Sequence, residues 1–255
     1  MLNRVEKGET EKIQGILRKD KAANVRISAL LTAYGTETSF FDVWRQDYKA
    51  VVARLDSSFF ICAENADLEE IAFFIAFSPN FRIVIGKSEE MAAIAKFLGD
   101  GYKKTEYDLL TFIEETKLAR RHEVDSAPRL EAVFEVLESA KSAEFSAGGF
   151  APWYADMSHR IRHGCARAFL LRDDGEPAAA CLVSAESAVC GLIAGVAAKP
   201  QLRGRGYAAQ VVAAACGVLC ESKKLPVIEC LPGLTEYYGK LGFKKTGGVT
   251  IIERT

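Results

Sequence analysis

The chain has 255 residues, of which 49% are hydrophobic and 26% are charged, and its formal net charge is −1. This length leaves room for one large domain or two small ones, and the hydrophobic fraction is high enough for a well-buried core. A net charge so close to zero argues against a nucleic-acid surface or a polybasic contact with a membrane.

The sequence carries no recognisable targeting or metal-binding signal. Residues 1–7 are polar and lack the apolar core of a signal peptide, and the apolar segment after Gly206 is too short to span a bilayer. The seven cysteines are scattered, without C-x-x-C spacing or metal-ligand spacing to a histidine. We therefore expect a cytoplasmic protein with free thiols, no metal and no membrane contact.

The N-terminal half predicts a small α/β domain over residues 1–115. Residues 8–19 and 25–34 are expected to form two short helices, separated by Ala22-Ala23-Asn24. Further along, the pattern predicts a helix over 68–77 and a short apolar strand over 81–85.

The C-terminal half, residues 116–255, predicts a larger unit built on a mixed α/β sheet. Asp173-Asp174-Gly175-Glu176 is a strong hairpin turn signal, and Gly247-Gly248 is expected to separate the last two strands. The strands are predicted near 122–125, 166–171, 177–184, 188–198, 226–230, 243–246 and 249–253. The helices are predicted from 128 onward, over 152–163 and over 206–222.

The most informative segment is Gln201-Leu202-Arg203-Gly204-Arg205-Gly206, which lies between a predicted strand and a predicted helix. The first turn of a helix presents backbone N–H groups without internal partners and carries partial positive charge. Glycines let a phosphate approach that backbone closely, and Arg203 and Arg205 add charge. The segment is therefore a candidate cradle for a diphosphate.

Two glycine-rich motifs compete for this loop. Gly204, Gly206 and Ala209 fit the dinucleotide fingerprint G-x-G-x-x-A. That motif places its first glycine at the very end of the strand, whereas residues 199–203 intervene here and the motif falls late in the chain. The pattern Q/R-x-x-G-x-G/A is instead the acyl-CoA signature of the GNAT superfamily of N-acyltransferases, which this region resembles.

A second motif makes the resemblance more specific. Tyr237-Tyr238-Gly239-Lys240-Leu241-Gly242-Phe243 is similar to the Y-x-k-L-G-F turn at the end of the last GNAT helix, with one predicted helix and one predicted strand between the two motifs. The resemblance covers roughly residues 120–255 and implies a GNAT-like fold that uses acetyl-CoA. The coenzyme-binding residues that it implies are Ala194, Val196, Ala198, Gln201, Leu202, Arg203, Gly204, Arg205, Gly206, Tyr207 and Ala208.

The same resemblance gives the strand before the loop a role. Backbone groups around Ala194 and Val196 are expected to pair with the pantetheine arm where the strand splays from its neighbour. An N–H near Ala194 is expected to polarise the thioester carbonyl, as an oxyanion hole does. Gly195 fits either a bulge with close backbone approach or a packing requirement.

The N-terminal half contains a shorter segment that is similar to the turn motif near the C-terminus. Residues 97–105 resemble 240–246 in the order glycine, aromatic, Lys, Lys, Thr, and each follows a predicted helix and strand. We hypothesise that about 36–113 form a degenerate, partial GNAT-like copy; the alternative is a common helix-ending turn that recurs by coincidence. No Q/R-x-x-G-x-G occurs before residue 200, so such a copy would have lost coenzyme binding. Its remaining role would be to form a wall of the acceptor pocket or to mediate self-association as a homodimer.

Two residues are candidates for proton transfer. By the resemblance, Tyr238 is the general acid for the departing thiolate, and the alternative is a core tyrosine. Glu229, within the apolar run 227–231, is the candidate base. The alternatives are that water relays the proton, and that Glu229 has a structural role or faces solvent. Residues 231–234 depart from many relatives, which have an Asn there that contacts the pantetheine arm.

The acceptor is expected near the second helix of the C-terminal half. Trp153, Tyr154, Asp156 and His159 are candidates to line its site, with Asp156 attracting a cationic amine. The competing interpretation places Trp153 and Met157 in the core and leaves the polar residues solvated.

The resulting prediction is an acetyl-CoA-dependent N-acetyltransferase acting on a primary amine of a small molecule or peptide. Two alternatives stay open: a non-catalytic acyl-CoA sensor or interaction protein, and a transferase for a longer acyl donor. No nucleic-acid partner is expected.

Overall fold

The computed structural model describes residues 1–113, 122–140 and 149–255, which divide into two compact units. Unit 1 comprises residues 1–109, 230–235 and 245–255, and unit 2 comprises residues 110–229 and 236–244. The predicted domain boundary between residues 115 and 116 lies outside the described residues. The units interleave in sequence, because the last strand begins in unit 2 and ends in unit 1.

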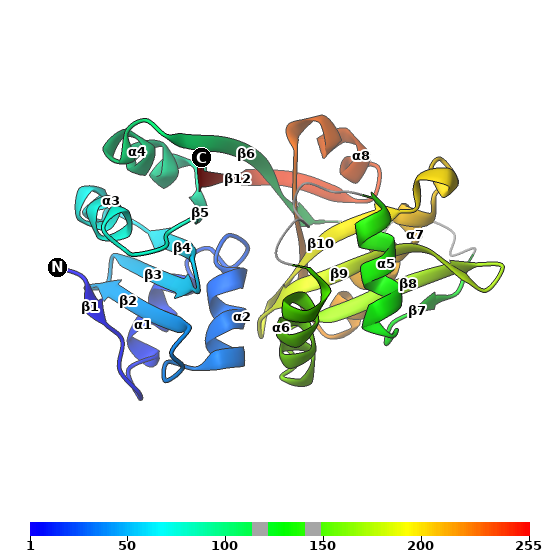
Figure 1. Cartoon of the computed structure of the whole chain (residues 1–255), viewed down its shortest axis with the longest axis horizontal. Helices are drawn as coiled ribbons and strands as arrows, with labels where there is room; N and C mark the ends of the chain where they lie inside the picture. The colour runs from blue at the N-terminus through cyan, green and yellow to red at the C-terminus, as the bar shows by residue number, and fades with distance from the viewer. Residues whose placement is uncertain (114–121, 141–148) are drawn as a thin grey trace. The chain divides into compact units, whose positions relative to one another are not determined.

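Unit 1 is a mixed sheet with strand order β1-β2-β3-β4-β5-β12-β6 (Figure 1). Strands β1 to β4 are successively antiparallel, β4 and β5 are parallel, and β12 is antiparallel to β5. Its elements are β1 (Asn3–Arg4), α1 (Glu11–Leu17), α2 (Val25–Tyr34), β2 (Phe41–Gln46), β3 (Ala50–Leu55), β4 (Ser58–Ala63), α3 (Leu68–Ala76), β5 (Ile83–Lys87), α4 (Ser88–Leu98), β6 (Tyr102–Phe112) and β12 (Phe243–Arg254).

Helices cover both faces of the unit 1 sheet. Successive residues of a strand point to opposite faces, so Val51 of β3 packs in the core under α1 and α2 whereas Val52 packs in the core under α3 and α4. Ile13 of α1 and Ile71 of α3 are fully buried in these two cores. The two cores, one on each face of the sheet, explain why residues 50–53 of β3 are all apolar.

Unit 2 has the strand order β7-β8-β9-β10-β11, with the end of β6 beside β11. Strands β7 to β10 are successively antiparallel, and β10 and β11 are parallel. Its elements are β7 (Val124–Asp125), α5 (Leu130–Ala140), α6 (Phe150–Arg162), β8 (Arg167–Asp173), β9 (Glu176–Glu186), β10 (Cys190–Ala198), the 3₁₀ turn η2 (Pro200–Leu202), α7 (Tyr207–Glu221), β11 (Leu225–Cys230), the 3₁₀ turn η3 (Pro232–Leu234) and α8 (Thr235–Gly239).

The unit 2 sheet is likewise covered on both faces (Figure 1). Leu182 of β9 packs in one core with Val133 and Leu137 of α5. On the opposite face, the Cys181 thiol lies 3.4 Å from the carbonyl oxygen of Val211 in α7. Gly191 lets α7 approach β10, because a Cβ there would lie 2.5 Å from Leu219 Cδ2.

In the part of the chain that the structure describes, the two halves have the same order of ten α-helices and strands. The series β1-α1-α2-β2-β3-β4-α3-β5-α4-β6 corresponds to β7-α5-α6-β8-β9-β10-α7-β11-α8-β12, and the first five strands of each series pair in matching directions. The sheet position beside β5 is filled by β12, and the position beside β11 is filled by β6, so the two halves exchange their last strands. The N-terminal half therefore has the element order that the predicted copy requires, and this order begins at β1 rather than near residue 36.

The prediction of two closing strands is wrong, because Gly247 and Gly248 lie inside the single strand β12. Neither glycine has a positive φ. A Cβ on Gly248 would lie 2.7 Å from Ser88 Oγ, and one on Gly247 would lie 3.6 Å from Leu109 Cδ2. These glycines make room for neighbouring side chains and do not form a turn.

Candidate functional site

The parallel pairing of β10 and β11 is limited to their first residues. The paired register runs from Cys190 with Leu225 to Ile193 with Ile228, whereas β10 continues to Ala198 and β11 to Cys230. Ala194, Gly195 and Val196 are half-buried and lie in the stretch of β10 that does not pair with β11. The two strands therefore part beside the backbone groups that the resemblance assigns to the pantetheine arm.

A bulge reinforces this separation. The pairing of β10 with β9 shifts between Ala194 and Ala197, and Gly195 has φ +57° within the shift. A Cβ at Gly195 would lie 3.3 Å from Leu137 Cδ2. Both sequence interpretations of Gly195 therefore apply, since a bulge and tight packing occur together.

The predicted cradle connects β10 to α7. The Lys199 N–H donates to the Ala178 carbonyl oxygen at 2.9 Å, and residues 200–202 form the turn η2. Gly204 and Gly206 both have φ +81°, with no atom within 4 Å of the Cβ that another residue would add. Glycine is thus required here for backbone conformation, and the space around both positions is open.

The N-terminus of α7 presents amides to this open space. The first intrahelical hydrogen bond runs from Gln210 N–H to Gly206 O at 3.2 Å, so the amides of residues 207–209 precede the helical ladder. No side chain caps this end, and the first turn contains no acidic residue. Tyr207 is buried, Ala208 is half-buried and Gln201 is exposed. The helix end therefore has the donors and the dipole that an anion requires.

Two arginines flank the cradle. Arg205 Nη1 lies 3.1 Å from Asp173 Oδ2, and a hydrogen bond with the Tyr207 phenol is the largest cause that raises the pKa of Arg205. Arg203 Nη2 donates to the Ala140 carbonyl oxygen at 3.4 Å. Both guanidinium groups are exposed, so they can reach a phosphate with little rearrangement.

Sequence reasoning missed two neighbours of the cradle. The hairpin signal predicts only a turn at Asp173, and no sequence motif includes His122. His122 packs edge-on against Tyr207, with ring centroids 5.0 Å apart. No sequence signal identifies either residue, because both are distant from the loop in the chain.

Tyr238 lies in α8 and is 7% exposed. Its ring contacts Tyr237 at 5.0 Å and Phe243 at 6.2 Å between centroids. Gly242, with φ +89°, ends the turn that carries these residues. Glu229 is half-buried between buried neighbours near the end of β11. Both proton-transfer candidates belong to unit 2, as does the cradle.

The acceptor candidates lie on α6. Trp153 and Tyr154 join an aromatic cluster with Phe134 and Phe150, with centroid separations between 5.1 and 6.4 Å. Tyr154 also lines a cavity of about 590 Å³ with residues 128–131 at the start of α5. The cluster supplies an apolar wall on this side of unit 2.

The polar candidates of α6 have partners within the helix. Asp156 pairs with Arg160, which also donates to the Ser184 carbonyl oxygen at 2.7 Å. His159 stacks on His163, with ring centroids 4.1 Å apart. An amine that uses Asp156 would therefore compete with Arg160. Met157 is buried in the core, as the competing interpretation expected.

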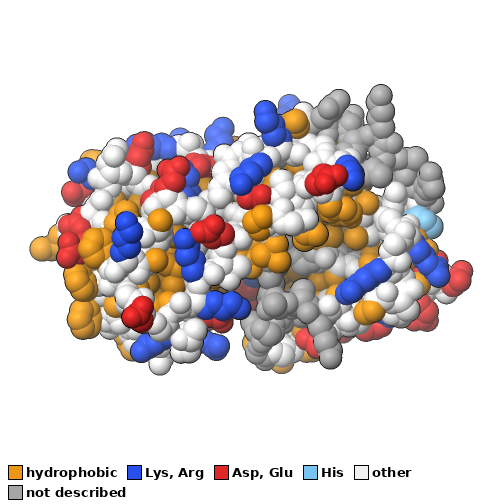
Figure 2. All heavy atoms as spheres, turned by 90° about the horizontal axis from the view of Figure 1, so that it is seen from above, with side chains coloured by type: hydrophobic (Ala, Val, Ile, Leu, Met, Phe, Trp, Pro, Cys, Tyr) orange, Lys and Arg blue, Asp and Glu red, His pale blue; other side chains and the backbone are white. Residues whose placement is uncertain are grey.

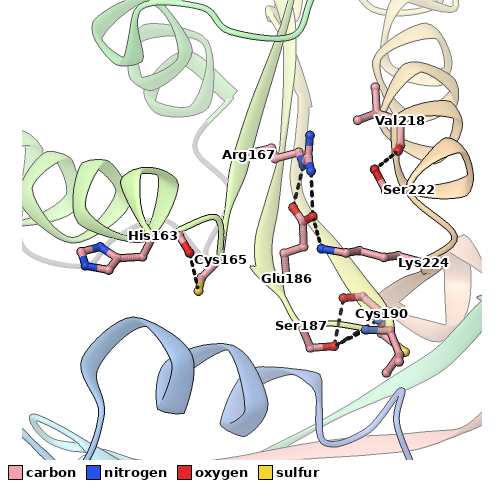
Figure 3. A network of polar contacts seen from close by, with 10 residues as sticks. His163, Cys165, Arg167, Glu186, Ser187, Cys190, Val218, Ser222 and Lys224 are labelled. Carbon is pink, nitrogen blue, oxygen red and sulfur yellow. Dashed lines mark hydrogen bonds and ion pairs between the residues drawn. The ribbon is translucent and has the colours of Figure 1, made fainter.

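A separate ionic network lies at the far end of the β8–β9 hairpin (Figure 3). Glu186, at the end of β9, accepts hydrogen bonds from Arg167 Nε at 2.7 Å and from Lys224 Nζ at 2.7 Å. Its side chain is completely buried. Arg167 pairs with Val183 while Asp173 pairs with Glu176, so this network and the cradle occupy opposite ends of one hairpin.

Lys and Arg are interspersed with Asp and Glu on the face in Figure 2. Among the residues that the structure describes, no three His, Cys, Asp or Glu side chains are grouped to hold a metal ion. None of the described helices combines the length and the hydropathy needed to cross a membrane.

Comparison with known proteins agrees with this geometry. Residues 130–243 match the model of the acetyltransferase (GNAT) family, and no curated protein matches the chain significantly. A GCN5-related N-acetyltransferase from Kribbella flavida has a similar structure, with TM-score 0.62, 16% identity and coverage of 91% of this chain and 95% of its own.

Two further structures match the whole chain. A Drosophila protein has TM-score 0.69 at 11% identity, covering 100% of this chain and 98% of its own. A tandem GNAT protein from the clavulanic acid biosynthesis pathway has TM-score 0.60 at 11% identity, with the same coverage. The C-terminal half of this chain is therefore a domain of the acetyltransferase (GNAT) family, and its N-terminal half has a GNAT-like fold.

Proposed function

We propose that unit 2 transfers an acetyl group from acetyl-CoA to a primary amine of a small molecule or peptide. The family supports acyl-CoA-dependent N-acyltransferase activity in general. The acetyl donor and the primary amine are the specific parts of the proposal. They rest on the residues of unit 2 and on the resemblance of its two motifs.

One observation carries the proposal: β10 and β11 part after Ile193 and Ile228, directly before the open amides of α7. The coenzyme has two parts that suit these neighbouring features. Its pantetheine arm carries amide groups that can pair with the backbone of Ala194, Val196 and Ala198. Its diphosphate suits the loop from Gln201 to Ala208, with Arg203 and Arg205 beside it.

Acyl transfer then proceeds by direct attack of the amine nitrogen on the thioester carbonyl carbon. A C–N bond forms, the C–S bond breaks, the thiolate gains a proton and the amine nitrogen loses one. Tyr238 is the proposed proton donor to the thiolate, because a phenol with a pKa of about 10 can protonate a thiolate at neutral pH. The proton from the amine leaves to Glu229 or through water.

The acceptor is proposed to lie along α6. Trp153 and Tyr154 would contact its apolar part, while Asp156 and His159 would face its polar groups. Since Asp156 already pairs with Arg160, a cationic acceptor must offer a better geometry than this i, i+4 pair to displace it.

The test is product formation from acetyl-CoA with a panel of primary amines and peptides, followed by mass spectrometry. Mass spectrometry is preferable to a thiol reagent, because Cys220 is an exposed cysteine outside any disulfide and would itself react with the reagent. The expected result is an acetylated amine that forms only with acetyl-CoA, while the matched alcohols give no product.

Calorimetry with coenzyme A separates the alternatives. Binding without turnover on any amine would favour the non-catalytic sensor. Faster turnover with longer acyl chains would favour a different donor. Absence of any association with coenzyme A would overturn the proposed function itself.

A further inference from the structure

Unit 1 contains a cavity of about 560 Å³ to which no role has been given. It is bounded by the α1–α2 connection, by the end of β4 with the loop after it, and by the junction of β5 and α4. Its lining includes Asp20, Asn24, Glu64, Lys87, Glu89 and Glu90. A volume of this size is typical of small-molecule sites.

The cavity lies where β4 and β5 separate. Their parallel register ends at Phe60 with Ile85. Beyond it β4 and β5 no longer pair with each other, and Cys62, Ala63 and Lys87 of these strand ends line the cavity. β10 and β11, their counterparts in unit 2, part in the same way. The duplicated fold therefore provides each unit with a gap between the same two strands.

The loop beyond β4 is unsuited to a diphosphate. Residues 64–67 read Glu-Asn-Ala-Asp and contain no glycine. The Asp67 side chain accepts the Glu70 N–H at 3.0 Å, and Glu69 and Glu70 lie in the first turn of α3. This helix end is already capped and negatively charged, so a phosphate would be repelled.

The ionisable side chains that line the cavity are predominantly acidic. Lys19 pairs with Glu64, and Lys87 lies 3.0 Å from Asp20. Both cations that line the cavity are thus neutralised within it, whereas Glu89 and Glu90 add two further carboxylates. Burial, which outweighs the charge of Lys87, raises the pKa of Glu90.

Two buried oxygen atoms of this cavity's residues lack hydrogen-bond partners. They are Oδ1 of Asn24, a residue that is 2% exposed, and Oε2 of Glu90. The other end of the Asn24 amide is used, since Nδ2 donates to the Leu17 carbonyl oxygen at 3.3 Å. Buried acceptors normally have a donor, so both atoms require one.

We propose that this cavity binds a small cationic amine, whose ammonium group donates hydrogen bonds to Glu90 and to Asn24 Oδ1. An ammonium group has three donors and no acceptor, which matches a cavity with unpaired acceptors and surplus negative charge. The site is separate from the acetyl-CoA cradle, and binding there does not depend on the acyl-transfer reaction.

The test is calorimetric titration of the full chain with 1,4-diaminobutane, in the absence of acetyl-CoA. The wild type should bind the diamine, and the neutral isostere 1,4-butanediol should not bind. Glu90→Gln should weaken diamine binding at least about tenfold, because it removes the charge that the ammonium group would face. Glu89→Gln, at the rim, should cause a smaller loss.

Glu69→Gln is the matched control, since this glutamate lies at the start of α3 and does not line the cavity. It should leave diamine affinity unchanged. Coenzyme A binding should be the same in all variants, so failure here is distinguishable from failure of the proposed function. Absence of diamine binding, equal binding of the diol, or unchanged affinity in both Glu90→Gln and Glu89→Gln would overturn the proposal.

Discussion

Ile193 and Ile228 are the last residues that β10 and β11 pair in register. Phe60 and Ile85 have the same position between β4 and β5. The two halves of the chain thus share a separation of two parallel strands, but the loops that follow differ. Residues 201–206 are basic and glycine-rich, whereas residues 64–67 are acidic and lack glycine. The fold supplies the gap in both units, and the loops that follow it differ in charge and in glycine content.

Replacing Gly195 with alanine should weaken acetyl-CoA binding and lower the free energy of unfolding. A non-glycine residue at φ +57° costs about 1–2 kcal/mol, and its Cβ would press against Leu137. Calorimetry and chemical denaturation measure the two effects. Gly15→Ala in α1 is the control, because no atom lies within 4 Å of its Cβ and φ is not positive; it should be neutral or stabilising.

Asp173 and Arg205 should have opposite effects on coenzyme affinity. Asp173→Asn removes a negative charge beside the cradle and frees Arg205, so it should tighten coenzyme A binding about twofold to fivefold, while Arg205→Ala should weaken it similarly. Both effects should shrink as salt is added. Arg172→Ala, whose guanidinium bonds to Gly175 O at 3.1 Å, is the control. A loss of affinity in Asp173→Asn would contradict this arrangement.

Tyr238→Phe should lower kcat about 100-fold while leaving the dissociation constant for acetyl-CoA nearly unchanged, because only the proton donor is lost. Single-turnover kinetics and calorimetry give the two quantities. The adjacent Tyr237 offers a matched control: Tyr237→Phe should retain activity. Full activity of Tyr238→Phe would remove this phenol from the mechanism.

The features of the site that arise within one short segment of the chain could be predicted from the sequence. The left-handed Gly204 and Gly206 and the start of α7 follow from one short segment, and so does the hairpin at residues 173–176. The pair Asp156 and Arg160 could also have been predicted, because opposite charges at i, i+4 on a helix commonly pair.

Features that depend on distant packing could not be predicted. Gly247-Gly248 resembles a turn in the sequence, and only the positions of Ser88 and Leu109 explain why both glycines lie within a strand. The contacts of Asp173 with Arg205 and of His122 with Tyr207 likewise join segments far apart in the chain. The hydrophobic periodicity of the sequence cannot reveal that β6 and β12 are exchanged, because each strand would have the same hydrophobic pattern in either unit.

Glu186 should make stability depend on pH through the network in Figure 3. Burial opposes its ionisation, but hydrogen bonds from Arg167 and Lys224 outweigh burial and lower its pKa from the ordinary value of 4.5. The unfolded chain therefore binds this proton more readily than the folded chain. The stabilisation from Glu186 is fully present above pH 4.5 and is lost as the pH falls through the lower pKa of the folded state.

Glu186→Gln should accordingly lower the free energy of unfolding at pH 7 by about 2 kcal/mol, since hydrogen bonds to a charged group are lost. The difference from wild type should shrink as the pH falls from 4.5 through the lower pKa of the folded state, where the carboxylate of the folded wild type becomes protonated. Denaturant melts across this range measure it. Glu176→Gln, at the exposed start of the same strand, is the control and should show no such convergence. A wild-type advantage that is constant with pH would mean that shape, rather than charge, makes Glu186 stabilising.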